Sequence, residues 1–212
     1  ELLKGYEEIE TLRLFPEPFF RERLFSVSDL SVLYGEKYAL RQFDFSMDGG
    51  ERVALIGGNG TGKSTFLKVL AGKLTACGTI DLSPRLKISY VPQIALYEGT
   101  LADYTADYDI NEAYFKAILA KFGFSRRDFS RNMREMSEGQ KKKAALARSL
   151  CERAHLYIWD EPLNYLDIAS REQVEKAVLS SGASLLFVEH DAAFTAAVAT
   201  RTVEFLPPNV EN

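Results

Sequence analysis

Cysteine and long apolar runs are both scarce in this sequence of 212 residues. The two cysteines, Cys77 and Cys151, stand far apart without the spacing of a metal site or a redox motif, so we expect free thiols. The longest apolar runs, residues 156–159 and 185–188, are far shorter than the roughly 20 residues that cross a bilayer. These absences favour a soluble protein.

The chain also lacks a strong net charge and a signal peptide. A formal net charge of −4 argues against a surface that coats nucleic acid without specificity, and an apolar content of 46% argues against disorder. The basic run Lys141, Lys142 and Lys143 is either a solvated helix face, the commoner case, or a local patch that contacts RNA phosphates. We expect cytoplasmic residence, and the absence of an initiator Met before Glu1 favours a fragment of a longer protein.

Three regions are expected along the chain. Residues 1–22 are interpreted as the end of an interdomain linker helix, stopped by Pro16 and Pro18. Residues 23–206 form the domain proper, and residues 207–212 form a loose tail. The apolar residues that recur at helical spacing in the first region are Leu2, Leu3, Tyr6, Ile9 and Leu12.

The pattern within the domain predicts an α/β fold with an antiparallel β subdomain and a helical insert. Alternating apolar residues over 25–32 and 43–47 indicate antiparallel strands, followed by a turn at 48–50. Helical segments at about 101–122 and 137–153 fall within an insert over about 94–153. A largely parallel core is expected from strands at 52–56, 86–91, 155–159 and 184–188, alternating with helices at 62–70, 170–179 and 192–199.

A phosphate-loop pattern, G-x-x-x-x-G-K-[ST], follows the predicted strand 52–56. Its glycines allow successive backbone N–H groups to converge on a phosphate at a helix N-terminus. Lys63 would bring a positive charge to the β- and γ-phosphates, and Ser64 could ligate Mg²⁺. The strand, loop and helix context favours a P-loop NTPase that binds MgATP over a Gly-rich turn without a ligand. The expected nucleotide-binding residues are Gly57, Gly58, Asn59, Gly60, Thr61, Gly62, Lys63, Ser64 and Thr65.

Two carboxylates end the apolar run 156–159. Asp160 and Glu161 should lie at the carboxyl edge of the sheet, beside the phosphate loop. We expect Asp160 to hold Mg²⁺ and Glu161 to polarise the attacking water as a general base. An exposed turn is the alternative where this pattern stands alone.

The segment Met136, Ser137, Glu138, Gly139, Gln140 resembles the Leu-Ser-Gly-Gly-Gln signature of the ATP-binding cassette (ABC) family, and the resemblance extends over about residues 24–205. In that family the serine and the second glycine, here Ser137 and Gly139, bind the γ-phosphate held by an opposite domain. The resemblance therefore implies a second cassette as a partner. Glu138 departs from the pattern, so its side chain is expected to point away from the phosphate, with a weakened trans site as the alternative.

Further positions match the family in order. Gln93 corresponds to the glutamine that senses Mg²⁺ and the attacking water, and His190 to the histidine that hydrogen-bonds the γ-phosphate. Tyr34 corresponds to the aromatic residue that stacks on adenine, with Tyr38 as a competitor. A structural role is the alternative for each residue when it is considered alone. The D-loop, which crosses the dimer interface, corresponds to Asn164, Tyr165, Leu166 and Asp167.

Two segments, residues 160–167 and 190–194, are similar to the ABC-F branch of the family. ABC-F proteins are soluble tandem cassettes that act on the ribosome and are joined by a long helical linker. Residues 1–14 resemble the end of that linker, which would make this domain the second cassette. Residues 87–93 and 141–160 resemble the branch that protects ribosomes from lincosamides, pleuromutilins and streptogramin A.

This resemblance implies definite partners. They are the first cassette of the same parent chain, or a second copy of this fragment, and the ribosome with its rRNA and tRNA. No membrane is involved in this interpretation. The alternatives are the energy subunit of an ABC transporter and an inactive cassette that serves as a scaffold.

Overall fold

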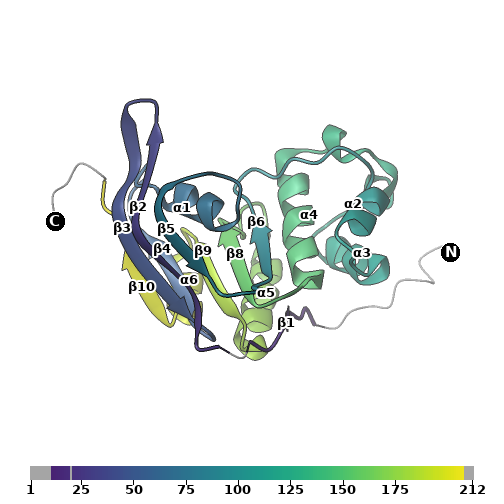
Figure 1. The fold of residues 1–212 in the computed structure, drawn as a ribbon. Coiled ribbons are helices and arrows are strands. Elements are labelled where there is room, and N and C mark those ends of the chain that lie inside the picture. Colours follow the sequence, from purple (N-terminus) through teal and green to yellow (C-terminus); the bar gives the residue numbers. More distant parts are fainter. Residues whose placement is uncertain (1–10, 20, 208–212) are drawn as a thin grey trace.

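The computed structural model describes residues 11–19 and 21–207. A five-stranded parallel sheet, in the order β10-β4-β9-β8-β6, forms the centre of the molecule (Figure 1). A three-stranded antiparallel sheet, in the order β3-β2-β5, lies beside it. The α/β fold, its antiparallel subdomain and its helical insert are therefore confirmed.

The central strands are β4 (Arg52–Ile56), β6 (Ile88–Val91), β8 (Leu156–Asp160), β9 (Ser184–Val188) and β10 (Arg201–Glu204). The antiparallel strands are β2 (Arg23–Tyr34), β3 (Lys37–Asp48) and β5 (Cys77–Leu82), and β1 (Phe15–Pro16) pairs with β7 (Arg153–Ala154). The α-helices are α1 (Lys63–Leu70), α2 (Leu101–Asp107), α3 (Glu112–Lys121), α4 (Glu138–Cys151), α5 (Ile168–Ser181) and α6 (Ala192–Val198). Two 3₁₀ turns, η1 (Asp128–Ser130) and η2 (Met133–Glu135), precede α4.

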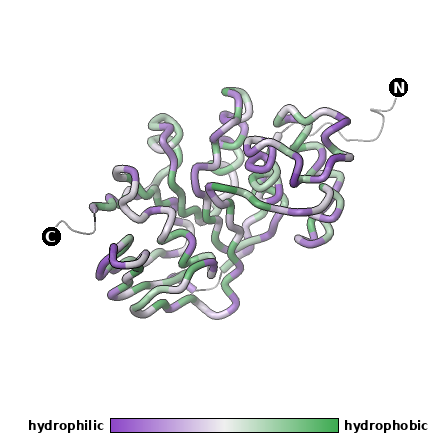
Figure 2. Tube along the Cα trace, turned by 90° about the horizontal axis from the view of Figure 1, so that it is seen from above, coloured by the Kyte–Doolittle hydropathy of each residue, from purple (hydrophilic) through white to green (hydrophobic). Residues whose placement is uncertain are grey.

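The parallel sheet separates two hydrophobic cores. Leu156 and Ile158 of β8 face α1 and the antiparallel sheet, whereas Tyr157 and Trp159 face α3 to α6. This division follows from the alternation of side chains along a strand, and burial on both faces explains the continuous apolar runs of β8 and β9. Along β2 and β3 of the antiparallel sheet, by contrast, hydrophobic and hydrophilic positions alternate over much of each strand (Figure 2). Among the described residues, no helix is both long enough and apolar enough to span a bilayer.

The expected linker helix is not found in residues 11–19. This segment is extended, and its strand β1 pairs in parallel with β7. Pro16 lies in that strand, and a proline cannot donate the hydrogen bond that a continuing helix needs. Leu12 and Leu14 are buried in the core that contains α3 and α4. Residues 1–10, where the rest of the linker helix was expected, lie outside the described residues, as do residues 208–212 of the expected tail.

The helical segment expected over residues 101–122 is divided in two. Asp109 has a φ of 49°, which ends α2, and the Asn111 side chain accepts a hydrogen bond from the Tyr114 N–H to begin α3. The start of α4 was predicted correctly, since Ser137 and Gln140 form a reciprocal capping box. Both cysteines are free thiols, as expected.

Candidate nucleotide site

The phosphate loop joins β4 to α1, and two of its glycines are required by close backbone contacts. A β-carbon on Gly57 would lie 2.4 Å from the Phe205 carbonyl oxygen, and one on Gly62 would lie 2.2 Å from the Ala39 carbonyl oxygen. Both glycines also have positive φ, 135° and 97°. A side chain at either position would therefore displace the loop.

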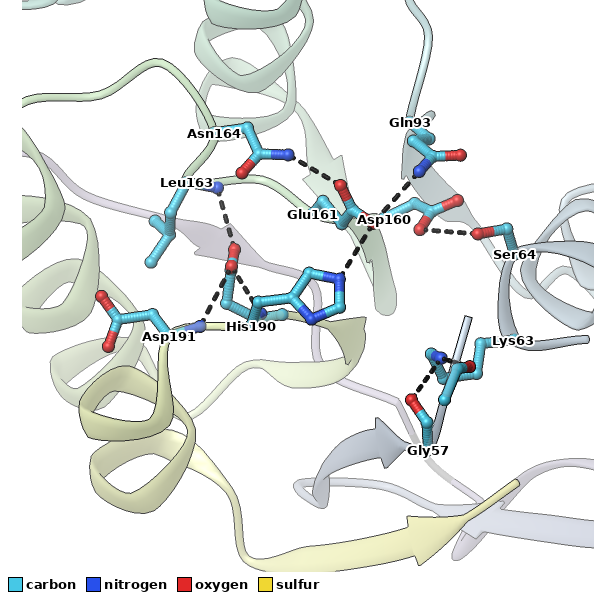
Figure 3. Close-up of polar contacts among 12 residues, drawn as sticks. Gly57, Lys63, Ser64, Gln93, Asp160, Glu161, Leu163, Asn164, His190 and Asp191 are labelled. Atoms are coloured by element: carbon cyan, nitrogen blue, oxygen red, sulfur yellow. Dashed lines mark hydrogen bonds and ion pairs between the residues drawn. The ribbon is translucent and has the colours of Figure 1, made fainter. Parts of the chain in front are cut away.

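Lys63 folds back across this loop, as Figure 3 shows. Its ammonium group donates hydrogen bonds of 2.7 Å to the carbonyl oxygens of both Gly57 and Gly58. The side chain is largely buried, and this burial lowers the pKa of Lys63 against the opposing effects of Glu161 and Asp160. The loop thus holds a desolvated cation where the phosphates of a nucleotide would lie.

A cavity of about 470 Å³ lies over the phosphate loop, a size typical of small-ligand sites. It brings together most of the residues that the sequence assigns to nucleotide binding and catalysis. Lys37, Ala39 and Val188 also line it, although no motif identified them. The predicted residues in its lining are Tyr34, Tyr38, Asn59, Gly60, Thr61, Gly62, Lys63, Ser64, Thr65, Gln93, Glu161 and His190.

Both candidates for the adenine contact reach this cavity. Tyr34 is 52% exposed and Tyr38 is 39% exposed, so either ring has a free face. The Arg41 guanidinium lies 5.5 Å from the centre of the Tyr38 ring, so one side of this ring already has a cationic neighbour. Tyr34 remains the predicted stacking residue.

Asp160 and Ser64 have the chemistry of a Mg²⁺ site. The Ser64 hydroxyl donates a 3.1 Å hydrogen bond to Asp160 Oδ1 (Figure 3). Asp160 Oδ2 is buried and has no hydrogen-bond partner among the described residues. Burial raises the pKa of Asp160, so its ionised form needs a positive partner. A hard cation with oxygen ligands would meet that need. Ser64 and Gln93 line the nucleotide cavity, whereas Asp160 does not and contacts Ser64 from beside it.

Glu161 lies at the centre of a hydrogen-bond network. Gln93 Nε2 donates to Glu161 Oε1 over 3.1 Å, and Asn164 Nδ2 donates to Glu161 Oε2 over 2.7 Å. His190 Nε2 lies 3.3 Å from Glu161 Oε1 (Figure 3). Glu161 has a φ of 54°, a left-handed conformation that is uncommon outside glycine and recurs at functional sites. Two segments distant in the sequence, those of Gln93 and His190, thus converge on one carboxylate, together with the nearby Asn164.

Glu189 connects two segments of this network, although the sequence analysis assigned it no role. Its two carboxylate oxygens accept hydrogen bonds from the backbone N–H groups of Leu163, at 3.1 Å, and His190, at 2.8 Å. It thereby joins the segment after Glu161 to the end of β9.

The four signature residues lie away from the cavity. Ser137, Glu138, Gly139 and Gln140 begin α4, which belongs to the helical insert beside β6 (Figure 1). The Glu138 side chain is exposed, as is that of Ser137. A role for these residues in phosphate binding therefore requires a second domain, and it remains a prediction.

The D-loop residues are divided between the site and the scaffold. Asn164 contacts Glu161, whereas Leu166 is buried in the core. Asp167 is the N-cap of α5, where its Oδ1 accepts a 2.8 Å hydrogen bond from the Ser170 N–H. That hydrogen bond lowers the pKa of Asp167.

Sequence reasoning did not identify the buried lysine of the basic run. Lys142 is only 2% exposed, and burial lowers its pKa to about 8 despite nearby Asp160, Glu161 and Glu189. Its helical phase was the available signal, because it shares a face of α4 with Ala145, Leu146 and Ser149, all buried. The interpretation of the whole run as a solvated face is wrong at this position.

Comparisons with known proteins agree with this arrangement. A family described as "ABC transporter" matches residues 40–164. "Ribosome protection protein VmlR" of Bacillus subtilis is 32% identical over 82% of this chain. "Erythromycin resistance ATP-binding protein MsrA" of Staphylococcus epidermidis is 29% identical over 87% of this chain. The chain spans only 32% of the length of VmlR and 38% of that of MsrA.

A solved structure extends the comparison to the fold. The "ATP binding subunit of ABC transporter" superposes with a TM-score of 0.72 at 29% identity, covering 89% of this chain and 88% of that one. Domains of this family bind ATP, generally use Mg²⁺ and hydrolyse ATP. The chain belongs to the ABC family and is one of its ATPase domains.

Proposed function

We propose that this chain is the second nucleotide-binding domain of an ABC-F protein that acts on the ribosome and protects it from antibiotics. The observation that carries the proposal is the 32% identity with a ribosome protection protein over 82% of this chain. The chain spans 32% of the length of that relative, so a parent protein of similar length would have room for another cassette and a linker as well. The ABC-F-like segment 160–167, which contains Glu161 and the D-loop, supports the same assignment.

In this proposal the cavity over the phosphate loop binds MgATP. The backbone from Gly57 to Thr65 and the Lys63 ammonium bind the phosphates, and Tyr34 stacks on the adenine. Ser64, Gln93 and Asp160 hold Mg²⁺, which would neutralise charge on the phosphate oxygens when bound. The division into an end of linker, residues 1–22, a cassette, residues 23–206, and a tail is part of the same proposal.

Hydrolysis then depends on the network around Glu161. This carboxylate accepts a proton from the attacking water as a general base, and Gln93 orients the water. His190, which lies beside the same carboxylate, hydrogen-bonds the γ-phosphate. The His190 contact with Glu161 would then be replaced by contacts with the nucleotide.

A complete site needs a second cassette. ABC domains work as dimers, and in this proposal Ser137 and Gly139 reach the γ-phosphate held by the partner, with Glu138 and Gln140 beside them. The capped N-terminus of α4 is suited to an anion, since its free N–H groups and helix dipole both favour negative charge. The partner is the first cassette of the parent chain or a second copy of this fragment. A role on the ribosome implies contacts with rRNA and tRNA in the cytoplasm.

The alternative function is that of an ABC transporter's energy subunit. A groove beside Gln93 favours it, because the apolar side chains of Ile94 and Leu96 are 66% and 82% exposed there. The solved transporter subunit, of which this chain covers 88%, is also similar. In that case the groove would receive a segment of a membrane partner.

Two assays test the proposal. The parent protein with closed, ATP-bound cassettes should co-purify with 70S ribosomes, and it should rescue translation in vitro in the presence of a lincosamide. The fragment alone should not rescue, because it lacks the first cassette and all but the end of the linker. Rescue by the fragment would show that the missing linker is not needed, and co-purification with a membrane protein instead of ribosomes would favour the transporter.

A further inference from the structure

The Lys142 side chain links the signature helix to both sides of the catalytic network. From α4 its ammonium group donates hydrogen bonds to the backbone carbonyl oxygens of Pro92 and Asp160, and it lies 3.5 Å from that of Gln93. Pro92 and Gln93 follow β6, and Asp160 ends β8. One buried cation thus contacts three carbonyl groups from two neighbouring strands and their loops.

Burial of the Lys142 ammonium group costs free energy unless its contacts with the three carbonyl oxygens are kept. A buried ammonium group loses its hydration, and the hydrogen-bond acceptors of Lys142 among the described residues are backbone carbonyl oxygens. The buried ammonium group is stabilised by charge-assisted hydrogen bonds to carbonyl oxygens, which are stronger than hydrogen bonds between neutral groups. Removing the ammonium group would in turn leave the Asp160 carbonyl, at the end of a fully buried strand, with one donor fewer.

The three carbonyl groups belong to the backbone that carries Gln93 and Glu161. The side chains of these two residues meet in a 3.1 Å hydrogen bond. The Lys142 contacts therefore connect the two backbone segments from which these side chains extend. We propose that Lys142 is a positioning residue that holds Gln93 and Glu161 at their working distance and ties both to the signature helix. This inference rests on the proposed roles of Gln93 and Glu161 in hydrolysis.

The two flanking lysines provide matched controls. Lys141 Nζ donates to the Arg134 carbonyl oxygen over 3.2 Å, and Lys143 Nζ donates to the Phe122 carbonyl oxygen over 2.8 Å. Both acceptors belong to the helical insert, and neither lysine lines the nucleotide cavity. The three lysines thus share a helix, a charge and a kind of acceptor, but only Lys142 contacts the segments that carry Gln93 and Glu161.

The test compares Lys142→Met with Lys141→Met and Lys143→Met in the full parent protein. We expect Lys142→Met to lower kcat for ATP by about 10-fold to 10²-fold, as misplacement of catalytic groups does, while the Kd for ATP stays within about twofold. The two control variants should keep kcat within about twofold. The proposal would be overturned if Lys142→Met kept the wild-type kcat, or if kcat fell equally in all three variants.

A double-mutant cycle with Gln93→Ala distinguishes positioning from a general loss of structure. If Lys142 acts through Gln93, the two losses in kcat combine to less than their product, because Gln93→Ala has already removed part of what Lys142 positions. Fully multiplicative losses would contradict the proposal. If Lys142→Met yields too little folded protein, Lys142→Gln replaces it, since the amide keeps a neutral donor for the carbonyl groups. ATP turnover is the readout throughout, so the result does not depend on whether the parent protects ribosomes.

Discussion

The ring of Tyr165 lies against the backbone of Gly139, so that a β-carbon built on Gly139 would stand 3.0 Å from ring atoms Cγ and Cδ1. Tyr165 follows Asn164, which contacts Glu161, and has a φ of 70°, and Gly139 lies in the first turn of α4. The ring is also 58% exposed. The segments predicted to be the D-loop and the signature are therefore in direct contact within this domain.

This contact leads to a prediction for Gly139→Ala. We expect ATP turnover to fall by about 10-fold or more while the isolated domain keeps its affinity for ATP, because Gly139 does not line its own cavity and is proposed to act in trans. The free energy of unfolding should change by less than about 1 kcal/mol, since the exposed ring can shift and alanine favours a helix. Steady-state turnover and chemical denaturation measure the two effects.

A double variant that combines Tyr165→Ala with Gly139→Ala identifies why ATP turnover falls. If the added methyl group acts by displacing the ring, removal of the ring restores turnover. If it obstructs the partner's phosphate, the double variant stays slow. Normal turnover in Gly139→Ala alone would contradict the assignment of the signature.

For Lys63→Ala we predict loss of most nucleotide binding. The affinity for ATP should fall by about 10²-fold, or about 2.7 kcal/mol, because a charge-assisted contact with the phosphates is lost. Calorimetry on the isolated domain measures it. Lys73→Ala is the control, since Lys73 is an exposed cation that follows α1 and lines a different groove. Equal affinity in Lys63→Ala and the wild type would remove the phosphate-loop assignment.

Some elements could be predicted from the sequence because their local signals agree with their burial. The strands β8 and β9 are apolar runs buried on both faces, and α4 begins at a capping box. In contrast, all six positions of β5 are exposed, and β10 is mostly polar and is specified by its pairing with β4. No periodicity marks strands of that kind, so tertiary pairing decides them.

The candidate site shows the same division. Lys63, Asp160 and His190 belong to motifs that follow a recognisable order along the chain. In the structure Lys63 and His190 line one cavity, and Asp160 accepts a hydrogen bond from Ser64 beside it. Lys142 and Glu189 belong to no such pattern, because they act through backbone groups of segments distant in the sequence. Only the tertiary structure identifies contacts of that kind.

Glu161→Gln should separate binding from hydrolysis. The amide retains the size of the side chain, so ATP affinity should be kept, whereas turnover should fall by roughly 10² to 10⁴, about 3 to 5 kcal/mol of barrier, through loss of the general base. Single-turnover hydrolysis in the parent protein measures the rate, and ATP-bound dimers should accumulate. Glu172→Gln, which alters an exposed carboxylate of α5, should leave turnover unchanged. Wild-type turnover in Glu161→Gln would place the base elsewhere.

The last prediction concerns acid stability and Asp191, the N-cap of α6. Its Oδ1 accepts 3.0 Å hydrogen bonds from the N–H groups of Ala193 and Phe194, and its Oδ2 lies 3.3 Å from Arg171 Nη1. The Phe194 N–H is the main cause of the lowered pKa of Asp191, because it favours the ionised carboxylate in the folded state.

The lowered pKa of Asp191 in the folded state decides how the stability changes with pH. A carboxylate with a lowered folded pKa contributes stability in full above its unfolded pKa of about 4, and loses it as the pH falls through the folded pKa. Asp191→Asn keeps an oxygen that can cap the helix but does not titrate. We therefore expect Asp191→Asn to be less stable than the wild type at pH 7 by under about 1 kcal/mol, because the group is largely solvated. The difference should shrink as the pH is lowered from about 4, and urea denaturation at a series of pH values measures it. A difference that stays constant from pH 7 to the acid limit would show that the asparagine changes packing and that the charge of Asp191 contributes nothing.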